Sequence, residues 1–294
     1  MTQLRTTGAA ALGPSPVLSS VRRLFGGIAI AAALSGTLVL AGCSGSGSTT
    51  GGSGGASSPS GSPSAAAQPQ TLTVFAATSL TAVFDRLKGG FESANPGVTV
   101  TYDYDGTSTL VTQLAQGAPA DVLASADEKN MQSAVDQKLV AGTPVDFATN
   151  VLEIATPPGN PKNIAGWADL AKPGVKLVVC ADGVPCGNAT EQVEKATGVT
   201  LTPVSQEQNV GNVLAKVESG DADAGVVYVT DVKGAGSKVT GVEFPESQKA
   251  VNTYPIAATA SSKNAALAQK FIDYVAGSDG QKLLSDAGFG APPK

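Results

Sequence analysis

The chain has 294 residues, of which 42% are hydrophobic and 15% charged, so it is long enough for one large or two medium domains. It contains no histidine, which removes the commonest general acid–base residue and with it the Ser-His-Asp and Cys-His nucleophile systems. Its formal net charge of −5 argues against nucleic acid or an anionic membrane surface as the binding partner.

Residues 1–43 have the order of a bacterial export signal. Three arginines precede an apolar run over residues 24–40, and the segment ends in Leu40-Ala41-Gly42-Cys43. This ending resembles a lipobox, the motif at which lipoproteins are cleaved before a cysteine that carries lipid. We therefore expect a signal peptide at 1–42 and lipid attachment at Cys43. An uncleaved membrane anchor is the alternative, although the apolar run is shorter than the ~20 residues that a span usually needs.

The segment 43–70 is predicted to be a flexible tether. Residues 44–69 contain only Gly, Ser, Thr, Ala, Pro and Gln, which cannot form a core. The folded part should begin near Thr71. Loss of residues 1–42 would remove three arginines and no acidic residue, so the exported chain would be more acidic than its precursor.

The first predicted strand runs from Leu72 into Ala76-Ala77-Thr78-Ser79 and is followed by a helix. Leu80, Val83, Phe84, Leu87 and Phe91 have the helical period, so we expect Thr78 or Ser79 at the helix N-cap. Free N–H groups at the positive end of a helix dipole make a ready anion site. The alternative is that Ser79 only caps its helix.

The same order of strand, small residue, hydroxyl and helix recurs. A strand over 98–104 ends at Asp105-Gly106, and Thr107 or Ser108 is predicted to cap the next helix. A short strand over 120–125 and a helix from about Asp127 follow. Alternating strands and helices predict a parallel sheet with crossover helices.

A second group of elements starts near Val151. We expect strands over 151–155, 175–179 and 224–228, with Asn209 capping a helix over 210–217, and then a strand over 254–259 and two closing helices. In open α/β sheets ligands bind at the carboxyl ends of strands. Tyr228 ends one strand and could direct its phenol into such a site, or it could be an ordinary half-buried tyrosine. None of these strand ends carries a Lys or Arg.

Several short motifs, in this order along the chain, resemble the molybdate-binding proteins that serve bacterial ABC importers. They are Val74-Phe75-Ala76-Ala77-Thr78-Ser79-Leu80, Ser108-Thr109-Leu110, Gly117-Ala118-Pro119-Ala120-Asp121, Ser125-Ala126-Asp127, Val184-Pro185-Cys186-Gly187, Val226-Val227-Tyr228 and Tyr254-Pro255-Ile256. The resemblance runs from about Thr71 to Phe289. It implies an α/β protein with a type II periplasmic-binding-protein fold, in which two lobes are joined by two crossing strands and close over an oxyanion in the cleft between them. Lobe 1 would comprise 71–150 and 253–294, and lobe 2 would comprise 151–252.

The resemblance also implies which residues bind the ligand. The ligand-contacting positions of the family fall on Ser79, Thr107, Cys186, Val210 and Tyr228. The first two would use hydroxyl and amide groups, Cys186 and Val210 their amides, and Tyr228 its phenol. The family often has Ser at the position of Thr107 and a small residue without sulfur at that of Cys186, which leaves the fine selectivity open.

The implied function is capture of molybdate, with tungstate as a further ligand, and its delivery to an ABC permease. The protein would be a monomer, lipid-anchored to the outer face of the cytoplasmic membrane, with no cofactor, no direct metal ligand and no nucleic-acid partner. A sulfate-type oxyanion-binding protein is the nearest alternative, because sulfate shares the charge and shape of molybdate. Phosphate ranks last because its proton rewards an acceptor carboxylate, which the five positions lack. An extracellular hydrolase using Asp and Ser is the alternative from another class, and a carboxylate beside the pocket would favour it.

Two cysteines remain once Cys43 is assigned to lipid. Cys180 and Cys186 are then a pair in an exported protein, where disulfides persist. A metal site is the competing hypothesis, but two sulfurs without histidine fall short of the usual four ligands. We expect a disulfide that holds the loop presenting the Cys186 amide.

Overall fold

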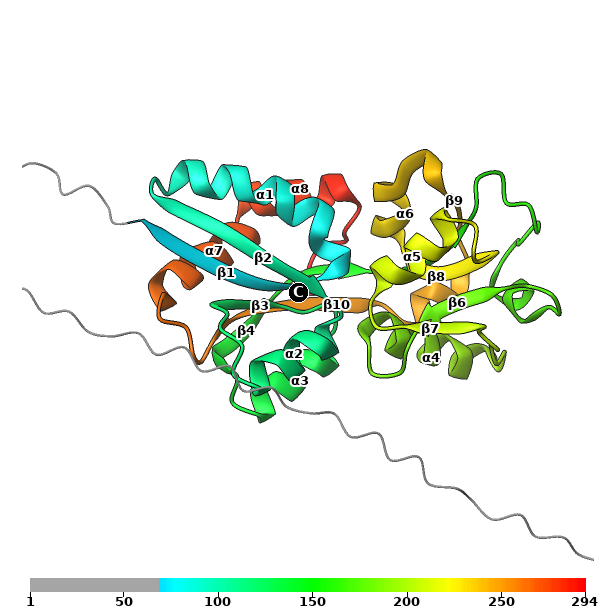
Figure 1. Cartoon of the computed structure of the whole chain (residues 1–294), viewed down its shortest axis with the longest axis horizontal. Coiled ribbons are helices and arrows are strands. Elements are labelled where there is room, and N and C mark those ends of the chain that lie inside the picture. The colour runs from blue at the N-terminus through cyan, green and yellow to red at the C-terminus, as the bar shows by residue number, and fades with distance from the viewer. Residues whose placement is uncertain (1–68) are drawn as a thin grey trace, which may run out of the picture. The chain divides into compact units, whose positions relative to one another are not determined.

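The structure is a computed structural model, and it describes residues 69–294. The predicted signal peptide at 1–42, the lipid site at Cys43 and nearly all of the tether at 43–70 lie outside the described residues. Two five-stranded sheets, each with its own helices, form two lobes (Figure 1). The prediction of an α/β protein with two lobes is confirmed.

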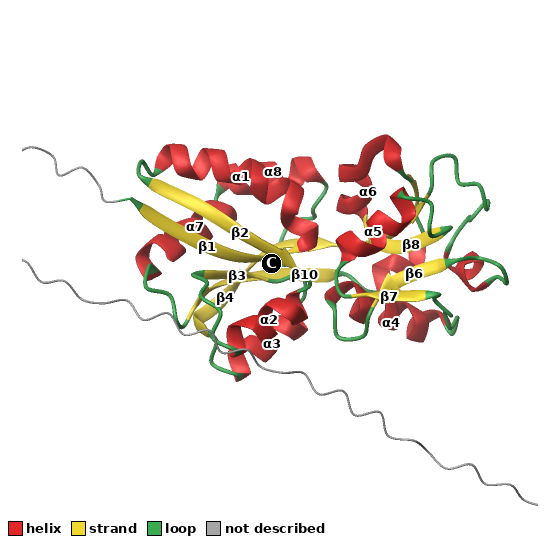
Figure 2. Ribbon diagram, viewed as in Figure 1, coloured by secondary structure: helices red, strands yellow, loops and turns green. Residues whose placement is uncertain are grey.

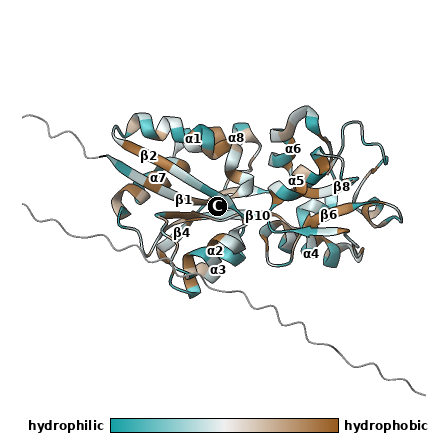
Figure 3. Cartoon of the chain, in the orientation of Figure 1, coloured by the Kyte–Doolittle hydropathy of each residue, from teal (hydrophilic) through white to brown (hydrophobic). Residues whose placement is uncertain are grey.

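The sheet of lobe 1 has the order β2-β1-β3-β10-β4. Its strands are β1 (Gln70–Ala77), β2 (Val98–Asp105), β3 (Val122–Ala124), β4 (Val140–Asn150) and β10 (Asn252–Thr259). Five helices pack around it, namely α1 (Thr81–Ala94), α2 (Thr107–Ala115), α3 (Glu128–Asp136), α7 (Ala265–Ala276) and α8 (Ser278–Ala287). The helix α1 buries Val83, Phe84, Leu87 and Phe91, the apolar face expected from its helical period. In Figure 3 this helix alternates between hydrophilic and hydrophobic residues along its length.

The sheet of lobe 2 has the order β7-β6-β8-β5-β9. Its strands are β5 (Leu152–Thr156), β6 (Leu177–Cys180), β7 (Ser205–Glu207), β8 (Ala224–Tyr228) and β9 (Thr240–Val242), and its helices are α4 (Pro185–Thr197), α5 (Val210–Glu218) and α6 (Val229–Ala235) (Figure 2). Short 3-10 turns lie at Thr78–Leu80, Trp167–Ala171, Gly236–Lys238 and Pro245–Lys249.

Each lobe has its own hydrophobic core. The core of lobe 2 draws its buried members from Leu152 to Ala250, whereas the cores of lobe 1 draw theirs from two stretches, Leu72 to Ala148 and Tyr254 to Phe289. The chain therefore crosses between the lobes twice, between β4 and β5 and again just before β10. No helix within residues 69–294 combines the length and the apolar character needed to cross a membrane.

The two sheets are mixed rather than parallel, which corrects the prediction. The strand β1 is parallel to β2 and β3, but β10 runs antiparallel to β3 and β4, and β5 runs antiparallel to β8 and β9. The antiparallel strands are those at the two crossings. Two neighbouring strands can be parallel only if a crossover connection, usually a helix, brings the chain back to the same end of the sheet. A strand at which the chain enters or leaves a lobe lacks such a connection.

Two predicted helix caps were also wrong. The cap of α2 is Gly106, and Thr107 is the first helical residue, while α1 starts only at Thr81 after a 3-10 turn over Thr78–Leu80. No hydroxyl caps either helix, so the side chains of Ser79 and Thr107 stay available for other partners. The predicted cap Asn209 is confirmed, because its side chain accepts the Asn212 N–H.

Candidate functional site

A small cavity lies between the two lobes, where the strands β1, β2 and β8 end at Ala77, Asp105 and Tyr228. Its free volume is about 10 Å³, so little open space remains between the residues that line it. All five residues predicted to bind the ligand line it: Ser79, Thr107, Cys186, Val210 and Tyr228. The rest of the lining is Ala77, Thr78, Asp105, Gly106, Ala126, Val184, Pro185 and Asn209. This lining contains no Lys or Arg.

A larger cavity, of about 540 Å³, lies in lobe 2 beside Phe244 and the turn Pro245–Lys249. It is lined by Glu243, Ser247, Gln248 and apolar residues, and among the described α-helices only α6 starts at it, at Val229. Three α-helices start at the small cavity, at Thr107, Pro185 and Val210, so it offers an anion more free N–H groups than the larger one does.

In lobe 1 the wall of the cavity carries two buried hydroxyls. Thr107 is fully buried, and its Oγ1 accepts the Ala126 N–H at 3.1 Å, which leaves the Thr107 O–H free to donate into the cavity. The Ser79 Oγ lies 3.0 Å from the Tyr254 hydroxyl, which belongs to β10 behind the cavity wall. Thr107 also starts α2, so its own N–H has no intrahelical partner.

In lobe 2 two helices begin at the cavity. Val210 is the first residue of α5, behind its cap Asn209, and Cys186 is the second residue of α4, behind Pro185. The first N–H groups of a helix have no intrahelical acceptor and lie at the positive end of the helix dipole. Amides from both lobes can therefore bind the same negative charge.

Cys186 is held in place by a disulfide. Its sulfur is bonded to Cys180, with 5.6 Å between the two Cα atoms, and this bond joins the last residue of β6 to the first turn of α4. The two sulfurs are therefore not available as metal ligands. Within residues 69–294 no group of three His, Cys, Asp or Glu side chains is placed to hold a metal ion.

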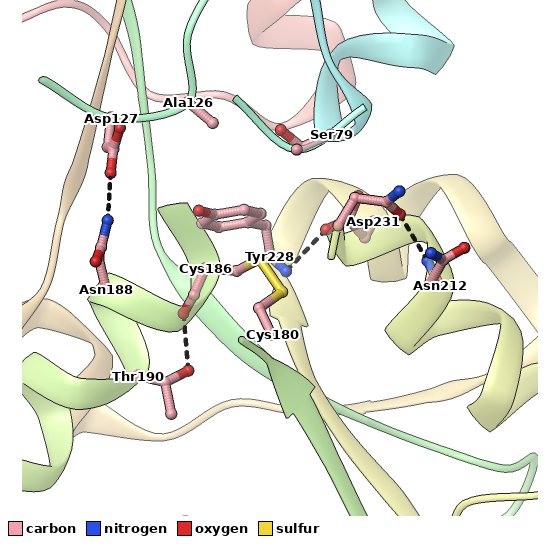
Figure 4. Close-up of a disulfide and its surroundings, with 12 residues drawn as sticks. Ser79, Ala126, Asp127, Cys180, Cys186, Asn188, Thr190, Asn212, Tyr228 and Asp231 are labelled. Atoms are coloured by element: carbon pink, nitrogen blue, oxygen red, sulfur yellow. Dashed lines mark hydrogen bonds between the residues drawn. A yellow bond between two sulfur atoms is a disulfide. The ribbon is translucent and has the colours of Figure 1, made fainter. Parts of the chain in front are cut away.

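Tyr228 contributes an unpaired hydroxyl. Its side chain is 1% exposed, so it is not the half-buried tyrosine of the alternative interpretation, and its hydroxyl has no hydrogen-bond partner among the described residues. Burial raises the pKa of this phenol well above its ordinary value, so it stays protonated and can donate. An unpaired buried hydroxyl is costly, and a ligand in the cavity would remove that cost. Figure 4 shows the Tyr228 ring between the disulfide and Ser79.

Asp105 is a lining residue that the sequence analysis missed. Its Oδ1 accepts the Gly106 N–H at 2.7 Å and the Asn209 side-chain N–H at 2.9 Å, so it fixes the turn before α2 and connects lobe 1 to lobe 2. The sequence feature that could have identified Asp105 is its position with Gly106 at the end of a predicted strand. What the sequence does not show is that the partner of this carboxylate is Asn209, 104 residues further along the chain.

The lobes are in contact on the side of α3 and α4. Asp127 accepts the Asn188 side-chain N–H at 2.8 Å (Figure 4). Asn130 donates to the Gly183 carbonyl at 3.0 Å. Lys129 donates to the side-chain oxygen of Asn188 at 2.8 Å. Because hydrogen bonds cross the cleft beside a cavity with buried walls, the structure has the closed arrangement, and a ligand can enter only when the lobes separate.

Two lobes with separate cores, two crossings of the chain and a cavity with buried walls at helix starts are typical of a solute-binding protein. Residues 72–290 match the family model described as bacterial extracellular solute-binding protein. The molybdate-binding protein ModA of Mycobacterium tuberculosis H37Rv is 47% identical over 223 residues, which cover 76% of this chain and 85% of that protein. The chain belongs to the family of bacterial extracellular solute-binding proteins.

Solved structures share the fold. The periplasmic molybdate-binding protein of Azotobacter vinelandii matches with a TM-score of 0.66 at 23% identity, over 76% of this chain and all of that one. The sulfate-binding protein SubI of M. tuberculosis H37Rv matches with a TM-score of 0.64 at 20% identity, over 75% of this chain and 86% of that one. Members of this family are extracytoplasmic solute-binding proteins, not enzymes, so the hydrolase alternative is dropped.

Proposed function

We propose that the protein captures molybdate outside the cytoplasm and delivers it to an ABC permease in the membrane. The observation that carries this proposal is the unpaired, fully buried hydroxyl of Tyr228 in a cavity lined by helix starts and lacking any cation. Its 47% identical relative is a molybdate-binding protein, which supports the same ligand. Tungstate, which has the same charge and shape, would be the second ligand.

In this proposal the oxyanion is bound by Ser79, Thr107, Cys186, Val210 and Tyr228. Ser79 and Thr107 donate from lobe 1, Cys186 and Val210 donate their amides from lobe 2, and Tyr228 donates its phenol. Hydrogen bonds to a charged group contribute about 1.5 to 3 kcal/mol each, so five or more could supply the roughly 8 to 12 kcal/mol of a micromolar to nanomolar site after the costs of binding. The protein would contact only the oxygen atoms of the ligand and not its molybdenum atom.

Sulfate is the second candidate, because a structural neighbour of this chain binds it and because it has the same charge as molybdate and no proton. Phosphate is disfavoured, since at neutral pH it carries a proton that needs an acceptor. Asp105 is the one carboxylate in the lining; two N–H groups occupy its Oδ1, so only its Oδ2 could accept such a proton. The remaining polar groups of the lining that we assign to the ligand are donors.

Calorimetric titration of the purified protein with molybdate, tungstate, sulfate and phosphate tests the proposal. We expect molybdate to bind with micromolar or better affinity and sulfate to bind more weakly. Ser79→Ala and Tyr228→Phe should each lower the molybdate affinity about ten- to a hundredfold, the value of one hydrogen bond to a charged group. Tyr274→Phe, which removes a hydroxyl outside the cavity, is the matched control. Absence of molybdate binding, or equal affinity in both site variants and the parent, would contradict the proposal.

We further propose that the mature protein is a monomer tethered to the membrane through lipid on Cys43. The Leu40-Ala41-Gly42-Cys43 order and the uncharged segment 43–70 support this anchor. Metabolic labelling with a fatty-acid analogue should mark the parent and not Cys43→Ser. If the variant still carries the label, the proposed lipid anchor at Cys43 is wrong, whereas the proposed binding function is unaffected.

A further inference from the structure

The hydroxyl of Ser79 is connected to a chain of buried hydrogen bonds that begins at Asn150, the last residue of β4. The Val151 N–H donates to the Asn150 Oδ1 at 3.0 Å, so the orientation of this amide is fixed. Its Nδ2 then faces the Thr230 Oγ1 at 2.8 Å and the Tyr254 hydroxyl at 3.4 Å. An amide nitrogen has only donors, so the Tyr254 oxygen is the acceptor in this contact.

The Tyr254 hydroxyl has two hydrogen-bond partners within residues 69–294, the Asn150 Nδ2 and the Ser79 Oγ. Only the serine oxygen can accept a proton, so the Tyr254 O–H must donate to Ser79 across their 3.0 Å contact. Tyr254 is fully buried, and burial raises the pKa of its phenol, so this proton is present at neutral pH.

The chain of bonds also limits the direction of the Ser79 proton. The Ser79 oxygen accepts from Tyr254, so its own O–H turns away from Tyr254, and Ser79 lines the cavity. The Tyr228 ring meets that of Tyr254 edge to face, with centroids 6.1 Å apart. The two phenols are close enough for each to shift the pKa of the other, although no hydrogen bond joins their hydroxyls.

We propose that Asn150 and Tyr254 are positioning residues that fix Ser79 as a hydrogen-bond donor and thereby select oxyanions that carry no proton. The inference rests on the proposed function and adds the selectivity of that site. A free serine hydroxyl can donate or accept, so it can bind a protonated anion as well as a deprotonated one. A serine whose oxygen is already occupied by Tyr254 favours donation, which suits molybdate and sulfate and disfavours the P–OH group of hydrogenphosphate.

A double-mutant cycle tests the inference. Molybdate affinity is measured by calorimetry for the parent, Tyr254→Phe, Ser79→Ala and the double variant. We expect Tyr254→Phe to lower the affinity about three- to tenfold when Ser79 is present and to have almost no effect when Ser79 is replaced, because Tyr254 acts through it. Tyr102→Phe is the matched control, since it removes a hydroxyl that donates at 3.0 Å to the Phe84 carbonyl within lobe 1, away from the cavity.

The second measurement is selectivity, which a structural role would not change. Competition against molybdate at about pH 8 gives the affinity ratio of sulfate to hydrogenphosphate, two dianions that differ in one proton. We expect Tyr254→Phe to lower this ratio several-fold, and Asn150→Ala, as a second and independent variant, to lower it less. Thermal unfolding without ligand confirms that each variant is folded.

The outcomes separate the two proposals. If the parent does not bind molybdate, the proposed function fails. If the parent binds but Tyr254→Phe costs the same affinity with and without Ser79, or leaves the sulfate-to-hydrogenphosphate ratio unchanged in both the Tyr254 and Asn150 variants, the positioning role is wrong and the function stands.

Discussion

At the residue scale, the proposed site would use neutral donors where a lysine would be the simpler choice. Thr107 and Tyr228 are almost fully buried, and their hydroxyls have fixed surroundings before any ligand arrives. Preorganised dipoles in a closed, low-dielectric cavity can bind a dianion without a counter-charge. A permanent cation would add attraction at every distance and to every anion, so it would weaken discrimination by size and protonation.

One buried carboxylate makes stability depend on pH. Glu153 in β5 is 7% exposed, and burial, together with the negative charge of Glu243, raises the pKa of its carboxyl from 4.5 to about 7. The folded state therefore holds a proton that the unfolded chain releases near pH 4.5. Stability from this group is highest below that pH and falls as the pH rises toward about 7.

Glu153→Gln, which imitates the protonated form, should remove that fall. We expect the variant to match the parent in unfolding free energy near pH 4.5 and to exceed it by about 3 kcal/mol at pH 8. Denaturant unfolding across this pH range measures the difference. Asp231, whose pKa burial also raises to about 7, is unchanged in both proteins and cancels in the comparison. Glu246→Gln is the control, and a parent and Glu153 variant with parallel pH profiles would contradict the assignment.

At the element scale, the sequence predicted what local patterns encode. The apolar face of α1 follows from the helical period of its apolar residues. The cap Asn209 follows from its residue type and position, because its side chain accepts the N–H of Asn212, three residues later. The strand β4 was missed because its first half is exposed and contains Gly142, Thr143 and Pro144, which break the alternation of strand residues. The antiparallel pairing of β10 was missed because it joins segments more than a hundred residues apart.

Some features of the candidate site could be predicted from the sequence, and others could not. Helix starts at Cys186 and Val210 can be located from sequence because each follows a strand and a turn residue. The contacts of Asp105 with Asn209 and of Ser79 with Tyr254 could not be, because they join residues 104 and 175 positions apart. The sequence therefore indicates which residues could bind the ligand, and only the fold reveals the residues that orient them.

The disulfide between β6 and α4 should contribute to both stability and binding. It closes a short loop, with a sequence separation of 6, for which the chain-entropy model gives about 2 kcal/mol. Replacing both Cys180 and Cys186 by Ala should lower the unfolding free energy by about that amount and weaken molybdate binding several-fold, because the Cys186 amide loses its fixed position. Denaturant unfolding and calorimetry measure the two effects. The parent in reductant should behave like the variant; an unchanged midpoint in both would refute this role.

At the scale of the whole molecule, binding requires the lobes to open and close. Thr107 is fully buried and Tyr228 is 1% exposed, so no ligand can reach them in the closed arrangement. The closed arrangement depends on a close approach at Gly106, where lobe 1 meets the backbone of lobe 2. A Cβ atom at Gly106 would overlap the Gln208 carbonyl and lie 3.4 Å from a Val184 methyl, and both residues belong to lobe 2.

Gly106→Ala should therefore impair closure without harming the fold. The backbone at this position has φ −62° and ψ 137°, which alanine adopts without strain, and the nearest atoms that the new methyl would meet all belong to lobe 2. We expect an unfolding free energy within about 0.5 kcal/mol of the parent, and a molybdate affinity about ten- to a hundredfold lower, since overpacking typically costs 1 to 3 kcal/mol. Gly89→Ala, whose added methyl meets nothing within 4 Å on α1, is the control and should leave the affinity unchanged. Small-angle X-ray scattering should show the parent becoming more compact with saturating molybdate and the Gly106 variant less so. Parent-like affinity and parent-like compaction in that variant would show that lobe closure does not depend on this contact.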